Sequence, residues 1–171
     1  MTAIDSNRAA AAVFSELVSG PEAGAAVVLN TGDEGLLGSL ARLSAEDASR
    51  SVNGGATIAA HAQHVRFGLS LLSRWAREGG DPFADARWDE PWKLSTVDAS
   101  QWQEIRSGLR METERWLEVL ASRPPETTRD LVWMIGSIAH LAYHVGAVRQ
   151  IHAASRGPRE GTFAPPASSG G

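Results

Sequence analysis

The stretch GSIAHLAYHVGAVRQI, residues 136–151, sets two histidines four positions apart in an otherwise apolar segment. Its apolar residues do not alternate with polar ones as they do in a half-buried strand, and their spacing is helical. The stretch belongs to a helix predicted from about Arg129 to Ala154. Because this helix is apolar almost all round, we expect it to be the most buried element of the fold.

The same periodicity predicts further helices before it. They are about Asp5 to Val18, a short helix around Leu36 and Leu43, about Ala56 to Glu78, and one that begins after Asp98. Breaker residues separate them: Gly20-Pro21, Asn53-Gly54-Gly55, Gly79-Gly80 and Pro124-Pro125. Thr31 or Asp33 is the expected cap of the short helix. Asp98 is the expected cap of the helix that begins directly after it, at residue 99.

The predicted fold class is therefore all-α. Helices joined by loops, without strands, favour an up-and-down four-helix bundle, here with an extra short N-terminal helix. We expect residues 1–155 to form one domain. Residues 156–171 are rich in Pro, Gly and Ser, which predicts a disordered C-terminal tail.

Composition excludes several functional classes. The 171 residues are 43% hydrophobic, enough for one core, and the net charge is -4 with a pI near 5.7. Without a basic excess, neither nucleic acid nor an anionic membrane surface is an expected partner. The chain has no cysteine, which excludes disulfides, cysteine metal ligands and a cysteine nucleophile. No basic-then-apolar signal segment and no membrane-spanning run is recognised, so we expect a soluble cytoplasmic protein.

His140 and His144 lie on one face of the last helix, with Cβ atoms about 6 Å apart. Such a pair can share a metal ion, although a transition metal needs three or four ligands. His64 and His61, on the Ala56 to Glu78 helix, are the candidates for the third ligand. The alternative is that these are ordinary buried histidines, but neutral rings buried among apolar residues lack hydrogen-bond partners.

Three segments resemble the DinB-like superfamily of bacterial four-helix-bundle proteins. They are ATIAAHAQHVRFGLSLL (56–72), DEPWKLSTVDASQWQEIRSGL (89–109) and the stretch quoted above, and the resemblance covers most of the chain from Asp33 to Ala154. It implies one divalent metal at one end of the bundle. Its ligands would be His140 and His144 of the HxxxHxG segment and His64, with His61 as the runner-up.

The resemblance also implies a function. Members with known activity use a low-molecular-weight thiol, as bacillithiol transferases and mycothiol- or glutathione-dependent isomerases and transferases do. We therefore expect a metal-dependent thiol S-transferase or related hydrolase. Its cofactor would be one divalent transition metal, zinc or nickel, and its partners a small-molecule electrophile and a thiol. The alternative is a non-catalytic helical metal-binding or interaction module.

The choice between His61 and His64 depends on helix geometry. The two residues differ by about 60° around the helix axis. The buried stripe lies nearer to His61, so packing alone favours His61, whereas the resemblance favours His64. We prefer His64, because an open site needs ligands at the margin of the core, where water and substrate reach the metal. His61 is then a packing residue or supports a ligand from behind.

Several other residues carry expectations. Trp88 and Trp92 occupy a charged loop and either fold back over the site or pack into a dimer interface, and we favour the structural role. Arg149 is expected to pair with an acidic residue of another helix. The pairs Asp33-Glu34 and Asp89-Glu90 are expected to be solvated.

Two expectations concern packing between helices. Gly146 is expected to let the last helix approach a neighbour closely. We also expect a homodimer with helix-to-helix contacts, because the aromatic loop and the long helices offer surfaces that a second copy could cover.

Overall fold

The computed structural model describes residues 5–158, and within this range the regular structure is entirely helical. The elements are α1 (Ser6–Ser19), α2 (Gly35–Ala41), α3 (Ala45–Ala48), α4 (Ile58–Glu78), η1 (Glu90–Lys93), α5 (Ala99–Ser122), α6 (Thr128–Ile151) and η2 (Ala153–Ser155). The all-α prediction is confirmed over these residues. Of the tail predicted for 156–171, residues 156–158 pack on the body, where Arg156 Nε donates to the Arg149 carbonyl oxygen, and the rest lies outside the described residues.

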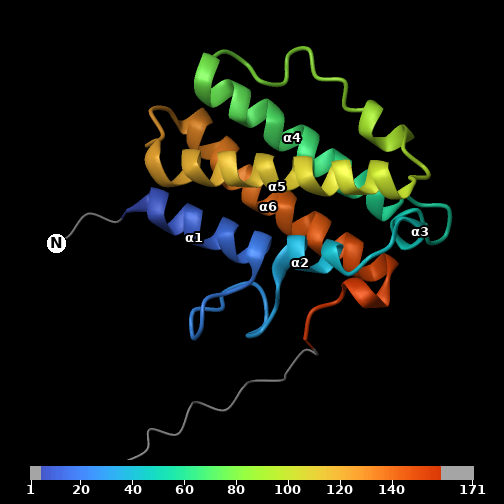
Figure 1. Cartoon of the computed structure of the whole chain (residues 1–171). Coiled ribbons are helices and arrows are strands. Elements are labelled where there is room, and N and C mark those ends of the chain that lie inside the picture. Colours follow the sequence, from blue (N-terminus) through green and yellow to red (C-terminus); the bar gives the residue numbers. More distant parts are fainter. Residues whose placement is uncertain (1–4, 159–171) are drawn as a thin grey trace, which may run out of the picture.

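The four long helices pack around one core (Figure 1). α4 contacts α5 and α6, and α1 contacts the same two helices from the other side. α1 is therefore one of the four core helices, and the fold has additional short helices in its N-terminal third. The additional helices are α2 and α3, which follow it in the sequence.

The expected up-and-down order is also wrong, because α4 and α5 run in the same direction (Figure 1). Near their first residues, Thr57 Oγ1 donates to the Leu94 carbonyl oxygen at 3.2 Å. At their last residues, Arg123 Nη1 donates to the Ala76 carbonyl oxygen at 2.6 Å. The physical reason is the connection 79–98, which is long enough to return along the whole of α4, a helix about 30 Å long.

Helix ends follow the capping residues in the sequence. The predicted cap Asp98 is confirmed: it forms a capping box with Gln101. The single short helix predicted around Leu36 and Leu43 is instead two helices, because Ser44 and Asp47 form a second capping box that starts α3. The cap predicted at Thr31 or Asp33 is wrong, because Glu34 is the N-cap of α2 and its side chain makes no cap bond; the Asp33 carboxylate instead accepts from the Gly35 N–H at 2.8 Å.

The expectation that α6 is the most buried helix is wrong. Tyr143, Val132 and Ile135 on its outer side are 67%, 59% and 56% exposed. α6 packs on α1 and α4 with one side only, and apolar composition does not reveal which side is covered. By length and composition alone α6 could also cross a membrane, contrary to the sequence expectation, and 33% of its most apolar 18-residue window is buried in the fold.

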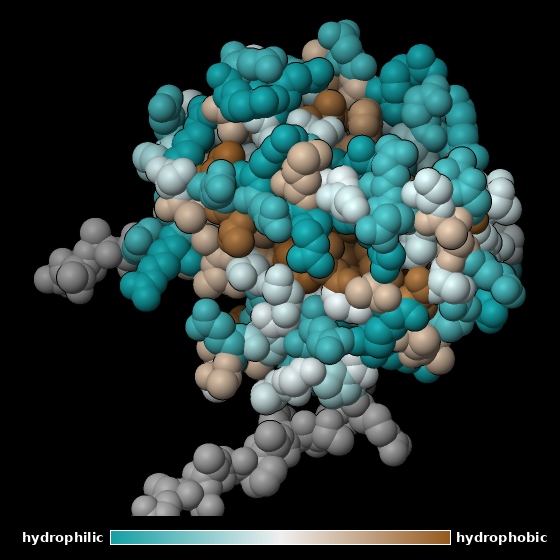
Figure 2. Space-filling model, viewed as in Figure 1, coloured by the Kyte–Doolittle hydropathy of each residue, from teal (hydrophilic) through white to brown (hydrophobic). Residues whose placement is uncertain are grey.

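The face seen in Figure 2 differs from this outer side of α6. Hydrophilic side chains cover most of it, and apolar side chains show in small patches between them (Figure 2). Amphipathic packing of this kind leaves the apolar stripe of each helix inside.

The glycine-rich segment after α1 is fixed by a buried carboxylate. Glu16 is 5% exposed, and its oxygens accept hydrogen bonds from the N–H groups of Val27, Val28 and Leu29 at 2.6–3.1 Å. Gly20 and Gly35, both with positive φ, let the two ends of the segment approach so closely that a Cβ on either would collide with backbone. This segment is the non-helical connection between the end of α1 at Ser19 and the start of α2 at Gly35.

Replacing Glu16 by Gln should lower the free energy of unfolding by about 1–3 kcal/mol, because the amide leaves three part-buried backbone donors with a weaker or missing acceptor. Urea denaturation measures the change. Glu22→Gln in the same segment is the matched control, since Glu22 is exposed. Equal stability of Glu16→Gln and the wild type would contradict the anchoring role.

Candidate metal centre

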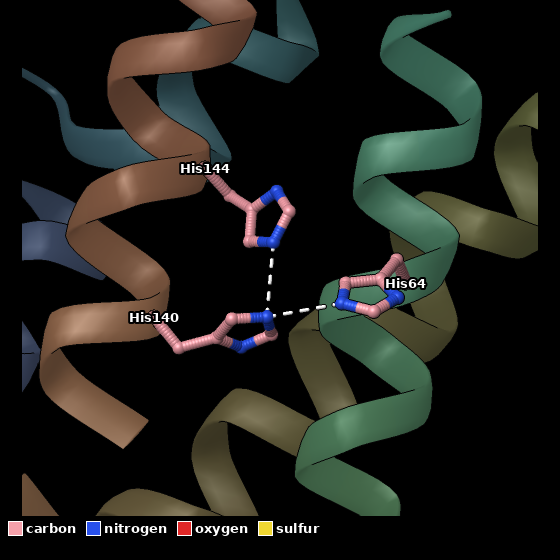
Figure 3. A group of neighbouring side chains, drawn as sticks. All are labelled: His64, His140 and His144. Atoms are coloured by element: carbon pink, nitrogen blue, oxygen red, sulfur yellow. Dashed lines mark hydrogen bonds between the residues drawn. The ribbon is translucent and has the colours of Figure 1, made fainter. Parts of the chain in front are cut away.

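Three of the four histidines that the sequence singled out meet between α4 and α6 (Figure 3). His64 comes from α4, and His140 and His144 come from successive turns of α6. One ring nitrogen of each lies within 4.8 Å of the other two. The Nε2 atom of His140 is 3.0 Å from Nε2 of His64 and 3.0 Å from Nε2 of His144.

Neutral imidazoles cannot satisfy both of these contacts by hydrogen bonds. Each ring has one N–H group and one lone pair. If His140 Nε2 carries the proton, it can donate well to only one neighbour, and if it does not, its single lone pair faces two neighbours. A cation at the meeting point accepts lone pairs from all three nitrogens at once.

The donor set fits a divalent transition metal. Nitrogen ligands about 2.0–2.1 Å from zinc lie about 3.3 Å apart in a tetrahedron, close to the two observed separations. Imidazole suits zinc, copper, iron and nickel, whereas magnesium and calcium prefer oxygen. Over the described residues the group contains no carboxylate, so three protein ligands leave at least one coordination position for another molecule.

His61 lies behind this group rather than in it. Its Nδ1 is 2.9 Å from Nδ1 of His144, the nitrogen opposite to the one that points toward His140. When His144 Nδ1–H donates to His61 Nδ1, the His144 tautomer has a free lone pair on Nε2. Both His61 and His64 are buried, at 8% and 7% exposed, so it is the direction of each ring that separates their roles.

The cluster is neutral at pH 7. Burial, reinforced by the charges of neighbouring histidines, lowers the pKa of His64 to about 4 and that of His144 to about 3. Burial also lowers the pKa of His61 and of His140. The lone pairs of His64 and His144 are therefore available to a metal well below the usual histidine range near 6.5.

Two tryptophans cover the cluster. The ring of Trp92, in η1, lies 4.3 Å from the ring of His64 and meets His61 edge-on at 5.3 Å. Trp88 lies 5.5 Å from the ring of His64. Of the two roles considered for these residues, folding back over the site is the one that this geometry fits. η1 itself is tied by ion pairs of Lys93 with Asp89 and Glu90.

One buried polar atom in the cluster is left without a partner. His64 Nδ1 has no hydrogen-bond partner among the described residues. Burying such a group costs about 1–3 kcal/mol.

His140 is less enclosed than the other histidines of the cluster. It borders a pocket of 250 Å³ between α4, α6 and the loop that carries Trp88. The cluster therefore has one open side.

Other residues singled out from sequence lie elsewhere. Arg149 forms an ion pair with Asp33 at 2.7 Å, so pairing with an acidic residue is confirmed, although Asp33 lies in a loop rather than in a helix. The expectation that Asp33 is solvated is wrong, because its partner and the start of α2 enclose it. Gly146 is exposed and a Cβ there would meet nothing within 4 Å, so its expected role in close helix packing is also wrong.

Comparison with models of protein families, with curated proteins and with solved structures finds no match for this chain. The chemistry of the site therefore rests on the geometry of the histidines and their neighbours.

In the presence of chelator, the free energy of unfolding should fall as the pH drops from about 6.5 toward 4. In this window the histidines are protonated in the unfolded chain but stay neutral in the fold, where their pKa values are lowered. His144→Gln should flatten the fall, and His152→Gln, at the end of α6, should preserve it. Urea titrations at successive pH values measure this, and a stability that rises on acidification would contradict the assigned pKa directions.

Proposed function

We propose that this chain is a metal-dependent enzyme of the DinB-like superfamily. Its reaction is the transfer of a group to the sulfur of a low-molecular-weight thiol, or a related hydrolysis. The observation that carries the proposal is the meeting of three imidazole Nε2 atoms from α4 and α6, together with a pocket that one of the three residues, His140, lines. The resemblance of the same two segments to DinB-like proteins supports the choice of reaction.

Each part of the site has a role in this proposal. His64, His140 and His144 hold the metal, and zinc or nickel suits three neutral imidazoles. His61 orients His144 through the contact between their Nδ1 atoms. Trp92 excludes water from the side of His64. When bound, the metal supplies Lewis acidity that lowers the pKa of a thiol or water molecule reaching it.

The sulfur nucleophile must come from outside the chain, because the sequence has no cysteine. In the transfer reaction the thiol sulfur forms a new bond to the carbon of an electrophile. The leaving group departs with the electron pair of the broken bond, and the thiol proton passes to solvent. The sequence contains no lysine other than Lys93, which is occupied in ion pairs with Asp89 and Glu90.

The alternative function is a helical metal-binding module without catalysis. The burial of the cluster favours it, since His144 is only 2% exposed and Trp92 lies over His64. The open side at His140 favours the enzyme. Turnover with a thiol distinguishes the two.

Metal analysis of protein purified without an affinity tag should find one divalent ion per chain. His64→Ala should reduce the metal content to background, because it removes one of three ligands. His61→Ala should retain the ion with an affinity about 10–100-fold lower, the usual effect of losing a group that orients a ligand. Both variants are compared at equal folded fraction. Loss of metal in His61→Ala with retention in His64→Ala would overturn the assignment.

Consumption of bacillithiol, mycothiol and glutathione with an aryl halide or an epoxide tests the reaction. We expect the metal-loaded chain to accelerate the loss of at least one thiol, and His140→Ala to abolish this. His152→Ala, outside the cluster, is the matched control and should keep the activity. Tight metal binding without any acceleration favours the non-catalytic module.

The homodimer remains a proposal, now with a candidate surface. Val132, Ile135 and Tyr143 form an exposed apolar stripe along α6. Isolated exposed apolar residues are common, but a continuous stripe is typical of contact surfaces. Light scattering should give twice the 18.2 kDa mass of one chain, and Ile135→Glu should return it to the monomer value. A monomer mass for the wild type across a wide concentration range would contradict the dimer.

A further inference from the structure

The pocket beside His140 differs in chemistry from the other cavities of the molecule. α4 contributes Gly68, Leu69 and Leu72, α6 contributes Val132, Trp133, Gly136, Ser137 and His140, and the connecting loop contributes Phe83 and Trp88. Ser137 and His140 are the polar side chains of this lining. A larger cavity of 420 Å³ between α4 and α5 is lined instead by charges of both signs, including Arg66 and Glu104.

The aromatic walls of the pocket are fixed by mutual contacts. Phe83 meets Trp133 edge-on with ring centroids 5.8 Å apart, and it lies 5.6 Å from Trp88. Trp133 in turn meets Trp75 edge-on at 4.9 Å. Side chains held in this way keep their positions when a ligand binds, so little conformational entropy is lost on binding.

Two glycines line the pocket. A Cβ on Gly68 would meet His140 Cε1 and the ring of Trp88 at 3.7 Å, an ordinary van der Waals distance, so both rings lie close to α4 at this position. A Cβ on Gly136 would meet nothing within 4 Å, and the space above it belongs to the pocket. Gly136 lies one turn before His140, so a ligand above it is beside the metal centre.

We propose that this pocket binds the uncharged apolar part of the substrate, an aromatic or branched aliphatic group, and directs the reactive carbon toward His140. This inference rests on the proposed function and names its substrate class. A dry cavity of about 150 Å³ holds one benzene ring, so 250 Å³ accommodates a group of about two fused rings. A charged group is excluded, because the lining provides no opposite charge to offset its desolvation.

Indole, an uncharged two-ring compound, is the probe for the pocket. Titrated into the ¹⁵N-labelled full chain with chelator present, it should shift the indole N–H signals of Trp88 and Trp133. The Trp102 signal should stay in place, since its Nε1 donates to the Leu43 carbonyl oxygen away from the pocket. Shifts confined to other tryptophans, or none at all, would overturn the inference.

A matched pair of variants tests the position. Gly136→Leu should weaken indole binding at least about tenfold by filling the pocket, while Gly146→Leu, equally open and on the same helix, should stay within about twofold. Both changes replace a helical glycine by a better helix former, so folding should be preserved. Equal affinity in the two variants would overturn the proposal.

Cobalt(II) then tests the adjacency to the metal centre. In the cobalt-loaded chain the indole protons should broaden through paramagnetic relaxation. If cobalt is bound and the indole protons do not broaden, the placement of the pocket beside the metal centre is overturned. If the histidines bind no cobalt, the proposed function fails, whereas the titration without metal still decides whether the pocket takes apolar groups.

Discussion

The site depends on the antiparallel contact between α4 and α6. Three pairs of rings mark this contact along the helices: His61 with His144, His64 with His140, and Trp75 with Trp133. The sum of the residue numbers in each pair stays nearly constant, as antiparallel packing requires. Because both helices are rigid and capped at their first residues, the three imidazole nitrogens meet without a flexible loop to place them.

Burial gives the histidines their chemical state and also makes them costly. Removing imidazole from water disfavours the charged form, which keeps the lone pairs free for a metal at neutral pH. The same burial leaves His64 Nδ1 without a partner and sets two Nε2 contacts around His140 that one proton cannot satisfy. Stability is thus lost where binding chemistry is gained, which is common at functional sites.

The connection between α4 and α5 links the fold to the site. It must span the length of α4 because α5 runs parallel to α4, and on the way it passes over the histidines. Trp88 and Trp92 therefore lie where a short antiparallel turn could not have put them. This connection also supplies Phe83, so one segment contributes both to the apolar pocket and to the cover of the cluster.

The sequence by itself determined the long helices, the cap at Asp98 and the pairing of His140 with His144, because these depend on neighbours within four residues. Only the tertiary structure decided which way α5 runs, which side of α6 stays exposed, and which nitrogen of each histidine turns toward the others. It also buried Glu16 and Asp33, whose partners lie 11 to 13 and 116 positions away in the sequence. The reason is physical: local spacing fixes directions around one helix axis, whereas the contacts between axes depend on packing of the whole chain.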